Sequence, residues 1–149
     1  MKQLNYFFLL VITILLYSII HCKKEEEKPK NSEEKKTSYN MGVGPVQTKL
    51  DLGALDANLA KKGQKIFEEK CTACHKIEER YVGPSLKDVT KRRTPEWIMN
   101  MILDPMKMTA EDPDAKALLA EYLTQMTNQN ISLEDARAIL EYFRLIDNK

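Results

Sequence analysis

Hydrophobic residues between positions 51 and 149 recur every three or four positions, which is the spacing of one face of an α-helix. Leu59, Gly63, Ile66 and Phe67 follow this spacing until the chain reaches Cys71. A second series lies near the C-terminus and comprises Ala136, Ile139, Leu140, Phe143 and Ile146. The sequence shows no alternating pattern of the kind that marks a half-buried strand. The pattern therefore predicts an all-α domain.

Capping residues predict where three further helices begin. The expected helices run from Thr94-Pro95 to Leu103, from Asp112-Pro113 to about Leu123, and from Ser132 toward the C-terminus. The segment DPMKM, which holds Met106 and Met108, lies between the first two and is expected to be a loop. Gly63 lies inside the earlier helix, where glycine costs about 1 kcal/mol relative to alanine, so we expect a close helix crossing there. The whole region predicts one small domain of four to five short helices.

An apolar run from Tyr6 to Ile20 precedes the domain. A membrane-spanning helix needs about 20 apolar residues, so this shorter run is more typical of a secretory signal segment. Cys22 follows at the position of the lipid-modified cysteine of bacterial lipoproteins, and the region resembles a lipobox, although Ile19 and His21 stand where small residues are usual. We expect residues 1–21 to be a signal segment and Cys22 to be lipidated. The alternative is an uncleaved N-terminal anchor.

Residues 22–50 are dense in charge and nearly free of large apolar side chains. Such a segment cannot bury enough apolar surface to order itself, so we expect a flexible linker, with packing of Met41–Val46 on the domain as the alternative. The expected domain at residues 51–149 holds 15 basic and 17 acidic residues. This balance gives no electrostatic reason to bind nucleic acid. Lipidation and anchoring both imply a domain tethered to a membrane of the cell envelope and facing the periplasm.

The segment CTACH places Cys71 and Cys74 three positions apart, with His75 directly after them. A disulfide between the two would close a very small loop and add little stability. Zinc needs four ligands, and the only other histidine, His21, lies in the signal segment. A redox-active dithiol would follow a strand, and none is predicted here. Covalent haem fits best, because two thiols one helical turn apart reach two vinyl groups and the imidazole falls under the iron.

Residues Ala57–Ile146 resemble a single-haem class I cytochrome c. The resemblance is carried by the segments GQKIFEEKCTACH, VGPSLKDV, RRTPEWI, QMTNQN and ARAILEYF. It implies a cytochrome c fold around one covalent haem c with its iron. It also implies that the first and last helices cross near Gly63 and Tyr142 or Phe143. The Pro84 carbonyl is expected to accept a hydrogen bond from the imidazole nitrogen of His75 that does not bind the iron.

The second axial position of the iron can hold a methionine, a histidine or no residue, and the domain contains no histidine besides His75. Met126 lies in the polar segment QMTNQN just ahead of the last helix, where the resemblance places the distal ligand. Met106 and Met108 remain alternatives. The other two methionines of the domain, Met99 and Met101, are interpreted as core residues of a helix.

The segment RRTPEW holds three further candidates for contact with haem. In related cytochromes an aromatic N–H and basic groups bind the haem propionates, and the resemblance gives this role to Trp97 and to Arg93 or Arg92. The alternative for Trp97 is a core aromatic residue, and for the arginines a solvated surface.

Two axial ligands leave the iron no open position, so the sequence predicts an electron carrier and not an enzyme. The expected partners are redox proteins, such as a membrane quinol-oxidising complex and a terminal reductase or oxidase. The alternative function is a haem-based gas or redox sensor, or a peroxidase-like unit, in which the sixth position of the iron is open or the Met126 ligand is displaced.

Overall fold

The computed structural model describes residues 39–148. The expected signal segment, the expected lipidation site Cys22 and residues 23–38 of the expected linker lie outside the described residues. None of the helices in the described range is both long enough and apolar enough to cross a membrane.

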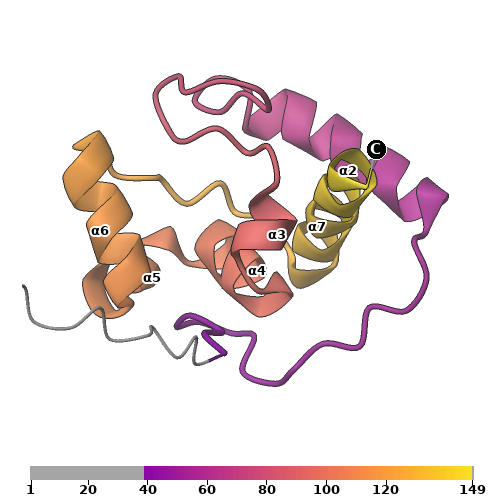
Figure 1. The fold of residues 1–149 in the computed structure, drawn as a ribbon, viewed down its shortest axis with the longest axis horizontal. Coiled ribbons are helices and arrows are strands. Elements are labelled where there is room, and N and C mark those ends of the chain that lie inside the picture. Colours follow the sequence, from indigo (N-terminus) through magenta and orange to yellow (C-terminus); the bar gives the residue numbers. More distant parts are fainter. Residues whose placement is uncertain (1–38, 149) are drawn as a thin grey trace, which may run out of the picture. The chain divides into compact units, whose positions relative to one another are not determined.

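Six helices and no strand occur within residues 39–148, which confirms the all-α prediction (Figure 1). They are α2 (Ala57–Lys70), α3 (Val89–Arg92), α4 (Pro95–Leu103), α5 (Pro105–Glu111), α6 (Pro113–Tyr122) and α7 (Leu133–Asp147). The predicted helix starts are confirmed by N-cap hydrogen bonds from backbone N–H groups to Thr94 (from Trp97, 3.2 Å), Asp112 (from Ala115, 2.8 Å) and Ser132 (from Asp135, 3.1 Å). Local capping chemistry thus sets where these helices begin.

The segment DPMKM is not a loop, and this expectation was wrong. It forms the start of α5, whose N-cap, Asp104, accepts a hydrogen bond from the Lys107 N–H (3.1 Å). Pro105 ends α4 and at the same time opens α5, because the first turn of a helix has no use for the N–H that proline lacks. Met106 and Met108 therefore have fixed directions on a helix.

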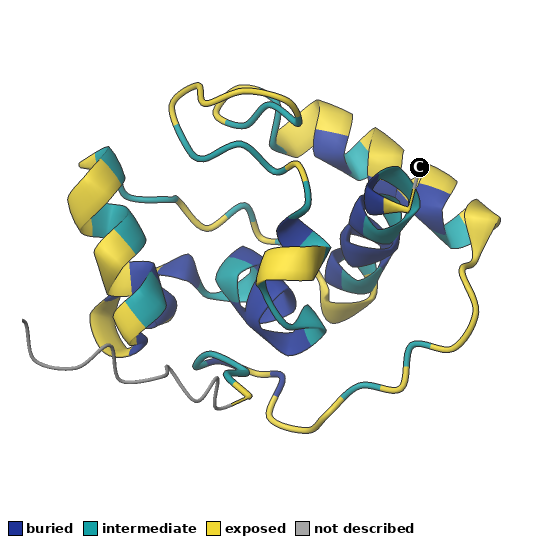
Figure 2. Ribbon diagram, viewed as in Figure 1, coloured by how far each residue is buried: buried dark blue, intermediate teal, exposed yellow. Residues whose placement is uncertain are grey.

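The crossing of α2 and α7 is the closest contact between helices. A Cβ atom added to Gly63 would lie 1.9 Å from the carbonyl oxygen of Ala138, so only glycine fits there. One turn later on α2, the ring of Phe67 packs against Tyr142 (centroids 5.6 Å apart) and Phe143 (5.7 Å). The expected crossing is confirmed, but Gly63 meets α7 one turn earlier than Tyr142. Figure 2 shows buried residues on both helices at this contact.

Residues 39–50, here called the strap, pack against α4 and α5 and belong to the domain. The side chain of Asn100 accepts a hydrogen bond from the Val46 N–H (2.8 Å) and donates to the carbonyls of Met41 and Val46 (2.9 Å each). Glu96 accepts hydrogen bonds from the Tyr39 hydroxyl and the Leu50 N–H (2.6 Å each). The expected domain boundary at residue 51 therefore lies too late in the chain.

Packing of Met41–Val46 on the domain was the alternative prediction, and polar groups hold the strap in this position. Glu96 and Asn100 are both fully buried, and each has hydrogen-bond partners on the strap. A buried polar group without a partner costs about 1–3 kcal/mol, so the strap and α4 require each other. Apolar periodicity cannot reveal such an attachment.

The helix crossing predicts the outcome of Gly63→Ala. In an isolated helix this change would gain about 1 kcal/mol. Here the added methyl group meets the backbone of Ala138, so we expect the free energy of unfolding to fall by at least about 2 kcal/mol. Chemical denaturation of the haem-loaded protein measures the change. Lys65→Ala, at an exposed position of the same helix, is the control, and equal stability of the two variants would contradict the close crossing.

Candidate functional site

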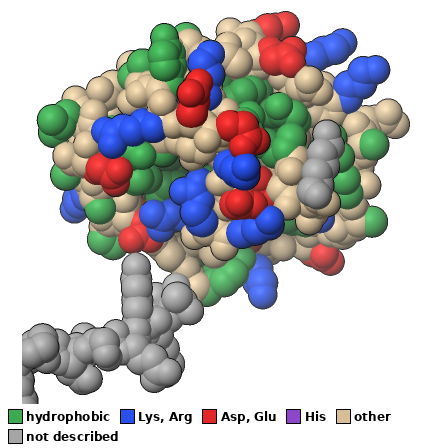
Figure 3. All heavy atoms as spheres, turned by 45° about the horizontal axis from the view of Figure 1, so that its top comes forward, with side chains coloured by type: hydrophobic (Ala, Val, Ile, Leu, Met, Phe, Trp, Pro, Cys, Tyr) green, Lys and Arg blue, Asp and Glu red, His purple; other side chains and the backbone are tan. Residues whose placement is uncertain are grey.

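A cavity of about 380 Å³ lies inside the helical domain, and all six helices contribute to its wall. This volume falls within the range of cofactor pockets, about 300–1,000 Å³. Its apolar lining includes Phe67 of α2, Ile98 and Ile102 of α4, Leu118 of α6 and Phe143 of α7. In Figure 3 hydrophobic side chains lie in a hollow of the surface with charged side chains around it. A large apolar ligand with a polar edge suits such a cavity.

The cysteines and the histidine of CTACH lie together in the wall of this cavity. The chain turns tightly here, because the backbone N–H groups of Cys74 (3.1 Å) and His75 (2.9 Å) both donate to the carbonyl of Cys71. Both cysteines are free thiols. Burial raises the pKa of Cys71 to about 11, while Cys74 is exposed. Two unpaired thiols facing one apolar cavity fit the attachment of haem c through thioether bonds.

His75 has its ring fixed by one hydrogen bond. Its Nδ1 lies 3.2 Å from the carbonyl oxygen of Pro84, which is the contact expected from the sequence. A carbonyl oxygen can only accept, so Nδ1 carries the proton and Nε2 keeps its lone pair for a metal. Burial lowers the pKa of His75, and the bond to Pro84 partly offsets this effect. The neutral imidazole in this tautomer is the form that ligates iron.

Gly83 was not singled out from the sequence as a site residue, yet it packs on the imidazole ring. A Cβ atom at this position would lie 2.5 Å from Cε1 and 2.9 Å from Nδ1 of His75. The Gly83 N–H also donates to the carbonyl of Cys74 (2.9 Å), which closes the loop over the CTACH turn. The signal in the sequence was a Gly-Pro pair shortly after the CTACH motif.

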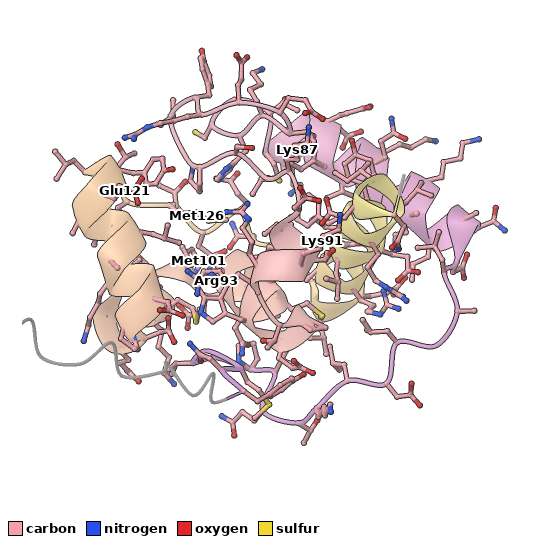
Figure 4. The ribbon with its side chains drawn as sticks, viewed as in Figure 1. Lys87, Lys91, Arg93, Met101, Glu121 and Met126 are labelled. Carbon is pink, nitrogen blue, oxygen red and sulfur yellow. The ribbon has the colours of Figure 1, made fainter. Side chains whose placement is uncertain are left out.

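Two methionines line the cavity, Met126 from the segment before α7 and Met101 from α4 (Figure 4). Met106 does not line it and is 57% exposed. Met108 is fully buried on another side of α5, where its sulfur accepts a hydrogen bond from the Val43 N–H (3.0 Å). Met101 packs against the hydrophobic core, as expected, and it also lines the cavity. Met99 is buried outside the cavity, as expected.

Trp97 and Arg93 also line the cavity, but other groups of the chain already bind them. The Trp97 indole N–H donates a buried hydrogen bond to Asp112 (3.0 Å). It is therefore not free to bind a propionate, and the alternative interpretation of Trp97 as a core residue holds. Arg93 forms an ion pair with Asp114, and its guanidinium lies 4.6 Å from the centre of the Trp97 ring. Only the remaining N–H groups of Arg93 can face a ligand.

Arg92 differs from its neighbour, because its guanidinium binds backbone carbonyls. Its Nη2 donates to the carbonyls of Ser85 (3.0 Å) and Lys87 (2.9 Å). Both acceptors lie in the chain that follows the CTACH turn, so Arg92 holds that chain against α3. This role was not expected from the sequence.

Comparisons with known proteins agree with this geometry. The sequence model of the cytochrome c family matches residues 60–146. A cytochrome c-552 from Nitrosomonas europaea is 32% identical over 85 residues, which is 46% of this chain and 77% of the relative. A cytochrome c-553-like protein from Synechocystis is 35% identical over 69 residues, 43% of this chain and 66% of that protein, just under two thirds.

A solved structure of cytochrome c from Rhodothermus marinus is 49% identical to this chain. The similarity covers 70% of this chain and 90% of that structure, with a TM-score of 0.67. The fold, the cavity, the two thiols and the imidazole together fit covalently bound haem c with its iron.

Gly83→Ala tests the packing on the imidazole. The added methyl group would overlap the His75 ring, so we expect the ring to turn and its bond to Pro84 to weaken. The electron paramagnetic resonance spectrum of the oxidised protein should shift or split, and its reduction potential should change. Tyr81→Ala, at an exposed position of the same loop that does not line the cavity, should leave both unchanged. If both variants behave like the parent protein, Gly83 has no part in orienting His75.

Proposed function

This chain belongs to the cytochrome c family, and we propose that it is a single-haem electron carrier whose iron is held between His75 and Met126. Haem c supplies the redox chemistry, the exchange of one electron between the ferric and ferrous states of its iron. Cys71 and Cys74 supply thioether bonds by adding their S–H groups across the two vinyl groups. His75 would bind the iron through Nε2, while its Nδ1–H donates a hydrogen bond to the Pro84 carbonyl.

The observation that carries the proposal is the distribution of methionines around the cavity. Met126 lines the same cavity as His75, whereas Met106 and Met108 do not. Met101 is the one remaining competitor, but it lies on α4 beside Ile98 and Ile102, within a hydrophobic helix face. Met126 lies between polar residues, where a methionine has little other reason to occur. A thioether ligand favours the ferrous state and raises the reduction potential.

An electron carrier needs no acid or base at its cofactor. The residues that line the cavity include the cationic groups Lys70, Arg92 and Arg93 but no carboxylate. Transfer then depends on how close a partner comes to the edge of the cofactor. We expect redox proteins as partners, with a membrane quinol-oxidising complex as donor and a terminal reductase or oxidase as acceptor.

The proposed location is a membrane of the cell envelope, with the domain facing the periplasm. It rests on the apolar segment before Cys22 and on the charged composition of the chain that follows. A lipid anchor on Cys22 would keep the carrier near membrane-bound donors. An uncleaved segment would do the same.

Met126→Ala is the test of the ligand. The variant should lose the near-infrared methionine-to-iron charge-transfer band of the oxidised protein, show a lower reduction potential and bind carbon monoxide when reduced. Met101→Ala and Met108→Ala should keep the band, and Met108→Ala should lose about 2–5 kcal/mol of stability as a buried residue. Loss of the band in Met101→Ala alone would assign the ligand to Met101. Ready carbon monoxide binding by the parent protein would favour the sensor or peroxidase-like alternative.

Mass spectrometry of protein extracted from membranes tests the location. The expected product begins at Cys22 and carries acyl chains. The Cys22→Ser variant should lose both the acyl chains and the membrane association. A parent product that retains residues 1–21 would support the uncleaved anchor.

A further inference from the structure

The segment that carries Met126 has no helical hydrogen bonds of its own to hold it. Residues 123–131, here called the distal loop, join α6 to α7 without regular secondary structure. Leu123 and Asn130, near its two ends, have positive φ angles of 52°, which non-glycine residues adopt at a cost. Contacts with the rest of the domain must therefore determine where the Met126 side chain lies.

Thr109 and Gln125 form a partly buried contact of this loop. The Gln125 side-chain N–H donates to the carbonyl of Met126 (3.0 Å). The Gln125 side-chain oxygen in turn accepts a hydrogen bond from the hydroxyl of Thr109 on α5 (3.0 Å). All three residues line the cavity, and Thr109 is buried. A chain of two hydrogen bonds thus connects α5 to the backbone of Met126.

The other side-chain hydrogen bonds that join the distal loop to the rest of the domain are longer and exposed. Asn128 donates to the carbonyl of Leu103 (3.3 Å), and Lys70 donates to the carbonyl of Gln129 (3.3 Å). Water competes with such exposed contacts, whereas loss of a buried partner leaves a polar group unsatisfied. Thr109 and Gln125 should therefore contribute more than the exposed pairs to holding the loop.

The Thr109 hydroxyl has one proton and three acceptors within reach. Its oxygen lies 2.9 Å from the carbonyl of Pro105, 3.1 Å from that of Met106 and 3.0 Å from the Gln125 side-chain oxygen. Sharing of one proton makes the link to Gln125 weaker than a full hydrogen bond. This contact still gives the distal loop one position. A single substitution can remove it.

We propose that Thr109 and Gln125 are positioning residues that hold Met126 in the cavity and so determine how readily an external ligand displaces it from the iron. The inference rests on the proposed function, because it requires Met126 to be the distal ligand. α5 provides a firm base for this contact. Its other side is fixed by the strap, through the hydrogen bond from Val43 to Met108 (3.0 Å). The balance between electron carrier and ligand-binding haem protein is thereby set by two residues that do not touch the iron.

Thr109→Val tests the inference, because valine keeps the shape of threonine and removes the hydroxyl. The probe is imidazole, which is added to the oxidised, haem-loaded protein and followed by its absorption spectrum. A net hydrogen bond is worth about 0.5–1.5 kcal/mol, so imidazole should bind about threefold to tenfold more tightly. Gln125→Leu should give a similar or larger increase. Thr109→Ser, which retains the hydroxyl, should restore the affinity of the parent protein.

Thr90→Val is the matched control. Thr90 also donates a helical hydroxyl, in this case to Asp147 (2.6 Å), and it does not line the cavity. Loss of the Thr90 hydroxyl should destabilise the fold without changing the affinity of the haem-loaded protein for imidazole. Equal tightening in Thr90→Val, or no rescue by Thr109→Ser, would overturn the positioning role.

Two outcomes separate this inference from the proposed function. If Met126→Ala loses the charge-transfer band while Thr109→Val and Gln125→Leu bind imidazole like the parent protein, the positioning role is wrong and the ligand assignment stands. If Met126→Ala keeps the band, Met126 is not the ligand, and both proposals fall.

Discussion

The contact between Gly63 and the backbone of Ala138 is the constraint on which the haem site depends. It brings α2 and α7 so close that Phe67, one turn further on, packs against two aromatic rings of α7. Helix α2 ends shortly afterwards, at Lys70, so the position of the crossing also determines where Cys71 begins its turn. Since Ile139 and Phe143 of α7 line the cavity, the same crossing fixes the attachment side and part of the apolar wall.

Buried charged and polar side chains hold the outer parts of the domain to this pair of helices. Glu141 of α7 is fully buried and accepts a hydrogen bond from the Asp56 N–H (2.8 Å), besides ion pairs with Arg137 and Arg144. Burial raises the pKa of Glu141, but these partners outweigh burial, so its pKa lies below the usual value. Its stabilising effect is therefore complete above the ordinary pKa of glutamate and is lost as the pH falls below it. Glu96 has the same balance of burial and hydrogen bonds on α4, with the strap as its partner.

The parts of this structure that follow from local sequence were predictable, and the parts that depend on distant partners were not. Thr94 and Ser132 each cap a helix by bonding the backbone N–H three residues further on. This signal is local, so the predicted starts of α4 and α7 were correct. Pro105 ends one helix and lies in the first turn of the next, and hydrophobic periodicity could not show that a second helix follows. The role of Gly83 and the hydrogen bonds that hold the strap were missed for another reason. Their importance comes from Asn100 and from the imidazole ring, which only the folded chain brings near them.

The two sides of the haem site also differ in whether they depend on local sequence or on distant parts of the chain. His75 adjoins Cys74 in the sequence, and the Pro84 carbonyl that orients it comes from the loop immediately after, so the proximal side is assembled from one short stretch of chain. Met126 follows α4, α5 and α6 in the chain and lies on a loop whose Gln125 side chain is hydrogen-bonded to Thr109. Substitutions in the body of the domain can thus change the distal side while the proximal ligand is kept. Under the proposed ligation by Met126, such substitutions would adjust the strength of the sixth ligand, and with it the reduction potential, without loss of the haem.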